Sequence, residues 1–344
     1  MKKIDDNFKK EVKEIIQSSN INFLIGAGAS RPYLPVLGNI EKDLLNAVND
    51  SDKVKIFKKY FKDVMLPNLN ILDFGKDLMG KNKKYFDETV TAYSEFYSEF
   101  STILMRRKSS LLSKQANIFT TNIDVFMEMV LEDLNIEYND GFFGRINPKF
   151  DSANFKKTFL KRSLQFENVS EIPTFNLIKL HGSLSWKKKN NSNKLFFSRL
   201  TQVKRLQEQT NDQKFEEEYK KLAIINPDKK KFEETVMDLT YYDMLRIFSG
   251  EMERETTVLF IFGFSLDDEH IRDLIFRSAN SNPTLKIYIF CYDLSTVSKI
   301  ESKINFESMK YENIEIIQPS DNKIQNKLNL RNIVNILFKN ILNS

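Results

Sequence analysis

Asn122 and His181 each follow an apolar stretch of the chain and have side chains suited to catalysis. Residues 119–124 read FTTNID, and residues 178–183 read IKLHGS. A carboxamide at the end of a strand can hold a water molecule or a ribose hydroxyl group, because it offers both a donor and an acceptor. A histidine can accept or share a proton near neutral pH. The sequence therefore makes Asn122 and His181 the candidate catalytic residues.

Both residues also have a purely structural interpretation. Asn122 has the side chain of a helix N-cap, but Asp124 is the better cap by position for the helix predicted at 125–134. His181 fits a satisfied, partly buried turn, which is the commoner place for an isolated histidine. Its position in a His-Gly-Ser turn directly after an apolar strand favours a functional role instead.

A glycine turn follows the first predicted strand. Residues 21–30 read INFLIGAGAS, so this strand runs into Gly26 and Gly28. Glycine lets backbone N–H groups approach an anion closely, and the N-terminus of a following helix adds a favourable dipole. Arg31 stands where the GxGxxG motif of dehydrogenases has its third glycine. Taken alone, the turn fits a phosphate-binding loop and a structural turn equally well.

A further polar turn lies in residues 258–271, which read VLFIFGFSLDDEHI. Ser265 and the N–H groups beside it are suited to bind phosphate or ribose. Asp267 and Asp268 stand at the start of a predicted helix, so we expect them to act first as caps and second as ligand contacts. His270, the other histidine of the chain, falls inside that helix, and we expect it to be structural.

The composition indicates a packed globular protein. The chain has 344 residues, of which 41% are hydrophobic and 29 are phenylalanines. That length suits one large α/β domain or two modest ones, and the apolar content excludes global disorder. The formal charge of +5 comes from 52 basic and 47 acidic residues spread along the chain. This pattern does not resemble the clustered basic face of a nucleic-acid-binding protein.

The only cysteine, Cys291, excludes an internal disulfide framework and a cysteine-rich zinc module. It lies in the apolar run KIYIFCYD, which predicts a small buried side chain. No apolar run approaches the roughly 18 residues that a membrane helix needs. The charged N-terminus lacks the apolar core of a signal peptide. We therefore expect a soluble, cytoplasmic protein that does not associate with membranes.

Near-continuous apolar strands alternate with helices along the chain, which predicts an α/β fold with a Rossmann-like parallel sheet covered by helices on both faces. The strands are predicted within 21–30, 116–124, 135–140, 173–186, 194–197, 223–227, 256–265, 285–293 and 313–319, with a polar hairpin tip at 187–194. The helices are predicted at 5–19, 40–48, 125–134, 201–222, 232–252, 267–279, 294–304 and 325–342. We expect one domain over 1–344, with a helical insertion at 52–115 and a C-terminal strand and helix at 305–344.

Ligands of such folds bind beyond the carboxyl ends of the strands. Five polar or turn residues lie just past predicted strand ends, namely Gly26, Asn122, His181, Gly263 and Asp293. One site can therefore collect residues that are far apart in the sequence.

Three of these motifs resemble a known family. GAGAS at 26–30, TTNID at 120–124 and KLHGS at 179–183 look like the three signature motifs of the sirtuin fold, in the family's order. The stretch at 225–271 resembles the bacterial sirtuin-like branch found in anti-phage defence systems. The resemblance spans roughly residues 20–293, and the helical insertion is its least typical part.

The resemblance implies that the chain binds NAD as its substrate. In this resemblance, the phosphates of NAD contact Gly26, Ala27, Gly28 and Ser30. The nicotinamide ribose lies near Asn122 and Asp124, and His181 is the catalytic histidine. The adenosine part of NAD contacts Gly263, Phe264 and Ser265.

One departure from the family pattern changes the expected activity. Sirtuin deacylases carry a four-cysteine zinc ribbon, which a chain with Cys291 alone cannot build, so we expect no zinc and no other metal ligands. The bacterial defence branch also lacks the ribbon and is associated with NAD hydrolysis, in which water replaces the acyl-lysine nucleophile. The leading expectation is therefore an NAD glycohydrolase (NADase) that acts as the effector of an abortive-infection defence system.

Two other functions remain open at this point. One is a sensor that binds NAD or ADP-ribose without cleaving it, and the other is an NAD-dependent protein deacylase or ADP-ribosyltransferase. A permanently active NADase would be toxic, so we expect control by homo-oligomerisation or by a separate subunit, such as a HerA-type ATPase. No direct contact with nucleic acid is expected. The helices at 52–115 and 325–342 fit assembly surfaces or ordinary sheet-covering helices equally well.

Overall fold

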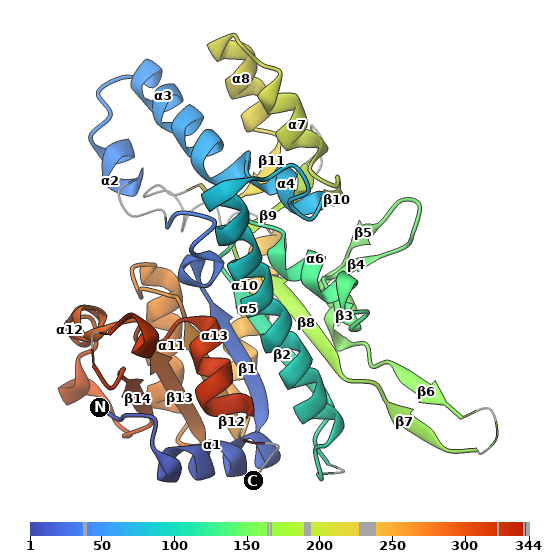
Figure 1. Ribbon diagram of the computed structural model, residues 1–344, viewed down its shortest axis with the longest axis vertical. Coiled ribbons are helices and arrows are strands. Elements are labelled where there is room, and N and C mark those ends of the chain that lie inside the picture. The colour runs from blue at the N-terminus through green and yellow to red at the C-terminus, as the bar shows by residue number, and fades with distance from the viewer. Residues whose placement is uncertain are drawn as a thin grey trace.

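A seven-stranded parallel sheet forms the centre of the larger of two lobes (Figure 1). The computed structural model describes residues 1–36, 40–109, 111–163, 165, 167–188, 194–226, 239–321, 323–339 and 341. The strand order is β14-β13-β12-β1-β2-β8-β3, and each neighbouring pair is parallel. The strands are β1 Asn20–Ile25, β2 Gln115–Thr120, β3 Tyr138–Asn139, β8 Thr174–Lys179, β12 Thr257–Phe262, β13 Leu285–Phe290 and β14 Ile314–Ile317. The expected α/β fold with a parallel sheet is confirmed.

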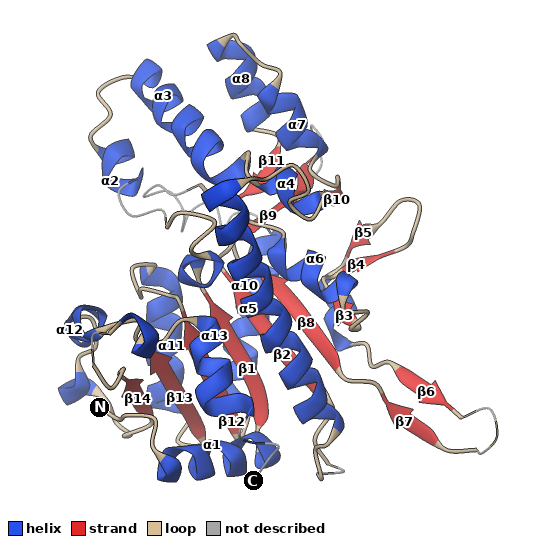
Figure 2. Cartoon of the chain, in the orientation of Figure 1, coloured by secondary structure: helices blue, strands red, loops and turns tan. Residues whose placement is uncertain are grey.

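Helices cover both faces of this sheet (Figure 2). Those on one face are α1 Asp6–Ser18, α5 Gly80–Met105, α6 Phe126–Asp133 and α13 Leu330–Ile333, which continues as a π-helical turn at Val334–Phe338. Those on the other face are α10 Leu239–Glu253, α11 Glu269–Ser281 and α12 Leu294–Glu301. Because both faces are covered, the strands are apolar along most of their length.

The first helix shows how local sequence produces this arrangement. The carboxylate of Asp5 caps α1 by accepting a hydrogen bond of 2.8 Å from the backbone N–H of Phe8. Phe8, Val12 and Ile16 then lie on one stripe of the helix, and all three are buried. The helix therefore presents an apolar face to the sheet and a charged face to solvent.

The helices of the smaller lobe, at the top of Figure 1, come from two segments that are distant in the sequence. Its helices are α2 Ile40–Leu45, α3 Asp50–Tyr60 with a π-helical turn at Phe61–Met65, α4 Asn68–Leu72, α7 Thr201–Gln207 and α8 Asp212–Tyr219. An antiparallel sheet of order β11-β9-β10-β5-β4 adjoins them. Its strands are β4 Phe142–Phe143, β5 Lys149–Phe150, β9 Gly182–Lys188, β10 Leu195–Phe197 and β11 Leu222–Ile224.

The two segments are held together by aromatic contacts between α3 and α8. The rings of Phe57 and Tyr219 lie 4.8 Å apart, and those of Phe61 and Phe215 lie 5.8 Å apart. Lys58 also forms an ion pair of 2.6 Å with Asp212. The helical segment expected at 52–115 therefore divides between the lobes, since α3 and α4 belong to the smaller lobe and α5 covers the large sheet.

Some expected elements differ in detail. The prediction of a single helix at 201–222 is wrong, because this segment forms two helices, α7 and α8. The break falls at Asn211, whose side chain accepts hydrogen bonds from the N–H groups of Gln213 and Lys214 and caps α8. The hairpin of β6 Leu160–Arg162 and β7 Val169–Glu171 projects from the body of the molecule in Figure 2.

The remaining regular segments are short 3-10 helices at Ala27–Ser30, Ser152–Lys156, Phe306–Ser308 and Ile324–Asn326. The tip of the predicted hairpin at 187–194, the start of the helix predicted at 232–252 and the end of the helix predicted at 325–342 lie outside the described residues.

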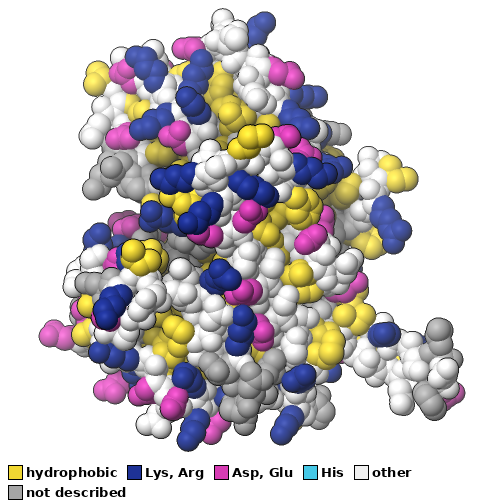
Figure 3. Space-filling model, viewed as in Figure 1, with side chains coloured by type: hydrophobic (Ala, Val, Ile, Leu, Met, Phe, Trp, Pro, Cys, Tyr) yellow, Lys and Arg dark blue, Asp and Glu magenta, His cyan; other side chains and the backbone are white. Residues whose placement is uncertain are grey.

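The surface and the core agree with the composition. On the face shown in Figure 3, Lys and Arg side chains are interspersed with Asp and Glu side chains. Cys291 is fully buried as expected, and burial raises the pKa of its thiol to about 12. Within the described part of the chain, every helix is too short or too polar to cross a membrane.

Candidate active site

A cavity of about 520 Å³ lies at the carboxyl ends of the central strands, where the two lobes meet. Of the ten residues that the sequence assigned to the site, nine line this cavity: Ala27, Gly28, Ser30, Asn122, Asp124, His181, Gly263, Phe264 and Ser265. Gly26 is not among the lining residues. Asp293 is not among them either, because it caps α12 by accepting a hydrogen bond of 2.9 Å from the N–H of Thr296. Parallel strands thus bring loops from four distant segments to one edge.

Asn122 is held directly after β2 by a chain of hydrogen bonds. The hydroxyl group of Thr120 donates to the carbonyl of Ile25 at 2.6 Å and accepts from the backbone N–H of Asn122 at 3.0 Å. The Asn122 Nδ2 atom lies 3.2 Å from the carbonyl oxygen of Gly26 and 3.2 Å from Ser30 Oγ. Among the described residues, no group donates a hydrogen bond to Asn122 Oδ1. The carboxamide is therefore oriented by its nitrogen and keeps its acceptor oxygen for another partner.

Ser30 joins this carboxamide to a buried carboxylate. Its hydroxyl group donates to Asp124 Oδ2 at 2.8 Å and shares a hydrogen bond of 3.0 Å with the hydroxyl of Tyr93. The other carboxylate oxygen of Asp124 accepts from the N–H of Phe126 at 3.2 Å. Burial raises the pKa of Asp124, and the charge of Lys179 and these hydrogen bonds oppose the rise. Asp124 thus accepts hydrogen bonds both from Ser30, which contacts Asn122, and from the first residue of α6.

Lys179 is a buried cation that the sequence analysis missed. It is 2% exposed and forms an ion pair of 2.7 Å with Glu128. Its ammonium group also donates to the backbone carbonyl of Asp124. Burial raises the pKa of Glu128, and Lys179 opposes that rise. The available signal was a lysine at the end of the otherwise uncharged strand TFNLIK, where it fixes the loop that carries Asp124.

The glycine turn is needed for a close approach between two loops. The N–H of Gly28 donates to the carbonyl of Gly263 at 2.9 Å. A Cβ atom on Gly26 would lie 2.6 Å from that carbonyl oxygen, and one on Gly28 would lie 2.8 Å from the Cα of Gly263. No side chain fits between these backbones, so the loops after β1 and β12 meet through glycine alone. The 3-10 turn Ala27–Ser30 then begins at the cavity wall.

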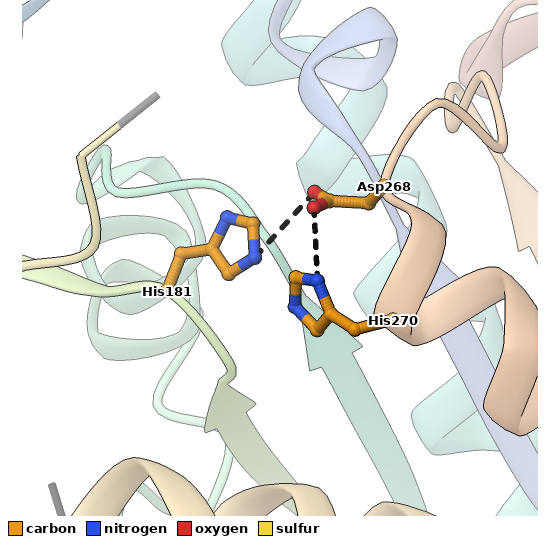
Figure 4. Close-up of side chains that lie close together, drawn as sticks. All are labelled: His181, Asp268 and His270. Carbon is orange, nitrogen blue, oxygen red and sulfur yellow. Dashed lines mark ion pairs between the residues drawn. The ribbon is translucent and has the colours of Figure 1, made fainter. Parts of the chain in front are cut away.

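His181 lies directly after β8 and faces a second histidine across one carboxylate (Figure 4). Its Nε2 atom is 3.5 Å from Asp268 Oδ2, and His270 Nδ1 is 3.4 Å from Asp268 Oδ1. The two imidazole ring centres are 5.7 Å apart. His270 lies inside α11 as expected, and its ring faces His181 and Asp268 beside the cavity; that its role is structural stays a prediction. The spacing Asp268-x-His270 at a helix start was the available signal.

The loop before this carboxylate has its own fixed position. The ammonium group of Lys303 donates to the carbonyl of Ser265 at 2.7 Å and forms an ion pair with Asp267. Asp267 and Asp268 therefore have different partners, since Asp267 pairs with Lys303, which follows α12, and Asp268 faces the two imidazoles.

Fold and site together define a Rossmann-like α/β protein with a cavity at the carboxyl edge of its sheet, lined by both polar and apolar groups. Residues 116–317, more than half of the chain, match the SIR2-like domain family, so the chain belongs to that family. The match begins after the glycine turn, which the structure nevertheless places at the same cavity.

The fold is shared with a solved Sir2 structure. A Sir2 mutant solved with a p53 peptide and NAD is 12% identical, with a TM-score of 0.50, over 98% of this chain and 99% of that chain. A second Sir2 structure, from a study of the mechanism and regulation of these enzymes, is 10% identical with a TM-score of 0.46 over 98% of each chain. The comparison with curated proteins yields no match.

Proposed function

We propose that the chain is an NAD glycohydrolase that cleaves NAD to nicotinamide and ADP-ribose. The observation that carries this proposal is the meeting of Asn122 and His181 at one cavity, with the Oδ1 atom of Asn122 lacking a donor among the described residues. The cavity volume of about 520 Å³ is that of an ordinary small-molecule site. Membership of the SIR2-like family and the NAD bound to a protein of the same fold support NAD as the ligand.

The chemistry follows from the leaving group. When the bond between C1′ of the ribose and the pyridinium nitrogen breaks, the electron pair stays on the nitrogen and neutral nicotinamide leaves, so no acid is required. Positive charge develops on the ribose as in glycoside hydrolysis. A water molecule then bonds to C1′ and loses a proton. The protein needs only to orient the ribose, place the water and accept that proton.

Each of these tasks has a residue in this proposal. Asn122 Oδ1 accepts a hydrogen bond from the attacking water and so orients it. His181 accepts the proton, directly or through a ribose hydroxyl group. The carboxylate of Asp268, 3.5 Å from His181, stabilises the imidazolium that forms. The turn at 27–30 lies against the diphosphate in this proposal, and its donors are backbone N–H groups other than those of Gly28 and Ala29, which donate to the carbonyls of Gly263 and Gly26.

The biological setting is proposed from the resemblance to the defence branch. The enzyme would act in the cytoplasm as the effector of an anti-phage, abortive-infection system by depleting NAD. Homo-oligomerisation, or a partner such as a HerA-type ATPase, would hold it inactive until infection. Size-exclusion chromatography with light scattering, alone and with the candidate partner, tests this assembly.

The enzymatic proposal is tested by incubating the purified protein with NAD, with and without the candidate partner, and separating the products by chromatography. We expect nicotinamide and ADP-ribose from the wild type. Asn122→Ala and His181→Ala should each lower the rate by about 10²–10⁴-fold, the range for a positioned acid–base group. Asp273→Asn, an exposed carboxylate on α11, is the matched control and should keep the wild-type rate.

Three outcomes would contradict the proposal. Full NAD consumption by both Asn122→Ala and His181→Ala would exclude the mechanism. Tight NAD binding by the folded protein without nicotinamide release would identify a sensor instead. NAD consumption that requires an acylated peptide or a protein acceptor would identify a deacylase or an ADP-ribosyltransferase.

A further inference from the structure

Two imidazoles and a carboxylate lie together beside the cavity, which His181 and Asp268 line, and this composition is that of a metal site. His181, His270 and Asp268 offer one ligand atom each, and these three atoms all lie within 4.8 Å of one another (Figure 4). His181 comes from the loop after β8, and the other two residues come from the start of α11. The group therefore exists only in the folded protein.

The spacing of the three side chains fits a shared ion. The two N···O separations are 3.5 Å and 3.4 Å and involve different oxygens of Asp268. Both are longer than a typical N–H···O hydrogen bond, which is about 2.9–3.0 Å long. Ligand atoms placed about 2.0–2.1 Å from a tetrahedral zinc ion lie about 3.3 Å from each other. The three ligand atoms lie within 4.8 Å of one another, so binding one ion requires side-chain rotations that draw them closer together.

The surroundings also favour a cation with an exchangeable ligand. The His181 and His270 side chains are each 8% exposed and that of Asp268 is 12% exposed, so the cluster is largely shielded from solvent. His181 and Asp268 line the cavity, which leaves the remaining coordination position on the cavity side. Three protein ligands with one open position are typical of zinc sites that bind water or a substrate. Imidazole nitrogen suits zinc, copper, iron and nickel better than magnesium or calcium.

We propose that His181, Asp268 and His270 bind a divalent transition-metal ion, best matched by Zn²⁺, and that the bound ion inhibits the enzyme. Metal binding follows from the cluster alone. The inhibition rests on the proposed NAD cleavage, because a metal held by His181 and Asp268 would remove the carboxylate contact that stabilises the imidazolium and would oppose a further positive charge on that ring. Inhibition by the bound metal would be reversible, because removal of the ion would restore NAD cleavage.

Metal binding is tested first, without NAD. Chelator-treated protein is titrated with Co²⁺, which reports coordination by visible absorption, and with Zn²⁺ in a calorimeter. We expect one equivalent bound by the wild type. His270→Ala and Asp268→Asn should each weaken binding by at least about 10-fold, the smallest loss found for removal of even an outer-sphere partner. Asp267→Asn removes the neighbouring carboxylate, which pairs with Lys303, and should bind metal as the wild type does.

The variants must be compared as folded proteins, so circular dichroism and thermal unfolding accompany each titration. A wild type that binds neither ion overturns the proposal. It is equally overturned if His270→Ala and Asp268→Asn bind as tightly as Asp267→Asn, since the ion would then lie elsewhere.

The effect on activity is measured separately. Zn²⁺ should inhibit NAD cleavage by the wild type, excess chelator should restore it, and half-inhibition of His270→Ala should need at least about 10-fold more Zn²⁺. Unchanged inhibition of His270→Ala would contradict the inhibitory role. If the wild type releases no nicotinamide under any condition, the proposed function fails, while the Co²⁺ spectrum still decides whether the metal site exists.

Discussion

The orientation of the Asn122 carboxamide follows from its neighbours. The carbonyl of Gly26 can only accept a hydrogen bond, so the side-chain atom 3.2 Å from it must be the nitrogen. Ser30 fills its own donor role towards Asp124 at 2.8 Å and therefore accepts from the same nitrogen. Both donors of Asn122 are thus directed at the protein. Its oxygen is the atom with which the side chain can act on a water molecule or a ribose.

The buried carboxylate of Asp124 gives a pH-dependent contribution to stability. Burial raises the pKa of Asp124 in the folded protein above its unfolded value, against the opposing effects of Lys179 and two hydrogen bonds. The folded state therefore binds this proton more tightly than the unfolded state does. The free energy of unfolding of the wild type, relative to Asp124→Asn, should rise as the pH falls from neutral through the folded pKa. It should level off below the unfolded pKa.

Urea denaturation of both proteins between pH 4 and 8 measures this difference. Glu128 also has a pKa raised by burial and is present in both proteins, so its titration largely cancels. A difference that is constant with pH, or that grows as the pH rises, would show that Asp124 is not desolvated in solution.

At the scale of elements, α5 behaves as part of the core. The ring of Phe23 on β1 meets Phe96 and Phe100 of α5 edge to face, at centre distances of 5.1 and 4.7 Å. Phe100 also contacts Phe338 of the last helical segment at 4.7 Å. The helix α5 therefore packs against both the central strand β1 and the C-terminal helical segment.

Phe100→Ala should lower the free energy of unfolding by about 3–5 kcal/mol, because a fully buried ring leaves a cavity between three elements. Phe143→Ala removes a ring that is 69% exposed and should change stability by less than about 0.5 kcal/mol. Chemical denaturation compares the two. Equal and small effects would mean that α5 is only loosely attached to the sheet.

The turn between β8 and β9 depends on one glycine. Gly182 has a φ of +78°, and a Cβ atom there would collide with the carbonyl oxygen of Ala223. Gly182→Ala should therefore cost about 1–3 kcal/mol of folding free energy. It should also displace His181, which precedes it.

Gly250 of α10 is the matched control for this substitution. A Cβ atom on it meets nothing within 4 Å, so Gly250→Ala should stabilise the helix by about 0.5–1 kcal/mol. Thermal and chemical unfolding of the two variants should thus shift in opposite directions. A destabilised Gly250→Ala, or a neutral Gly182→Ala, would contradict the backbone geometry.

At the scale of the whole molecule, the cavity is completed by both lobes. Tyr60 and Val64 line it from α3 and the π-helical turn, opposite the loops of the large sheet. Phe61 lies between them in sequence and packs against Phe215 of α8. The wall of the site is therefore held by a contact between two segments that are far apart in the chain.

Phe215→Ala should weaken this wall. Phe215 is 2% exposed, so its truncation should lower the free energy of unfolding by about 3–5 kcal/mol and also weaken NAD binding measured below the unfolding transition. Glu217→Ala, an exposed position on the same helix, should alter neither property. An unchanged NAD affinity together with the loss of stability would show that the smaller lobe does not shape the binding site.

The sequence by itself determined the strands, the loops at their ends and the side chains that those loops carry. Apolar strands separated by helices predict a parallel sheet, and a parallel sheet places all its carboxyl ends at one edge. Asn122, His181 and the turn at 26–30 could therefore be assigned to one site. The break between α7 and α8 was not predicted, because the charged residues continue through 201–222 and the only local signal of a new helix is the capping residue Asn211.

Only the tertiary structure decided how those loops meet. The position of His270 beside His181 depends on contacts between elements about 90 residues apart. The burial of Lys179 beside Glu128 depends on contacts between elements about 50 residues apart. Local propensity and periodicity describe one element at a time. The close approach of Gly26 and Gly28 to Gly263 likewise arises from the packing of two backbones, which has no counterpart within either segment.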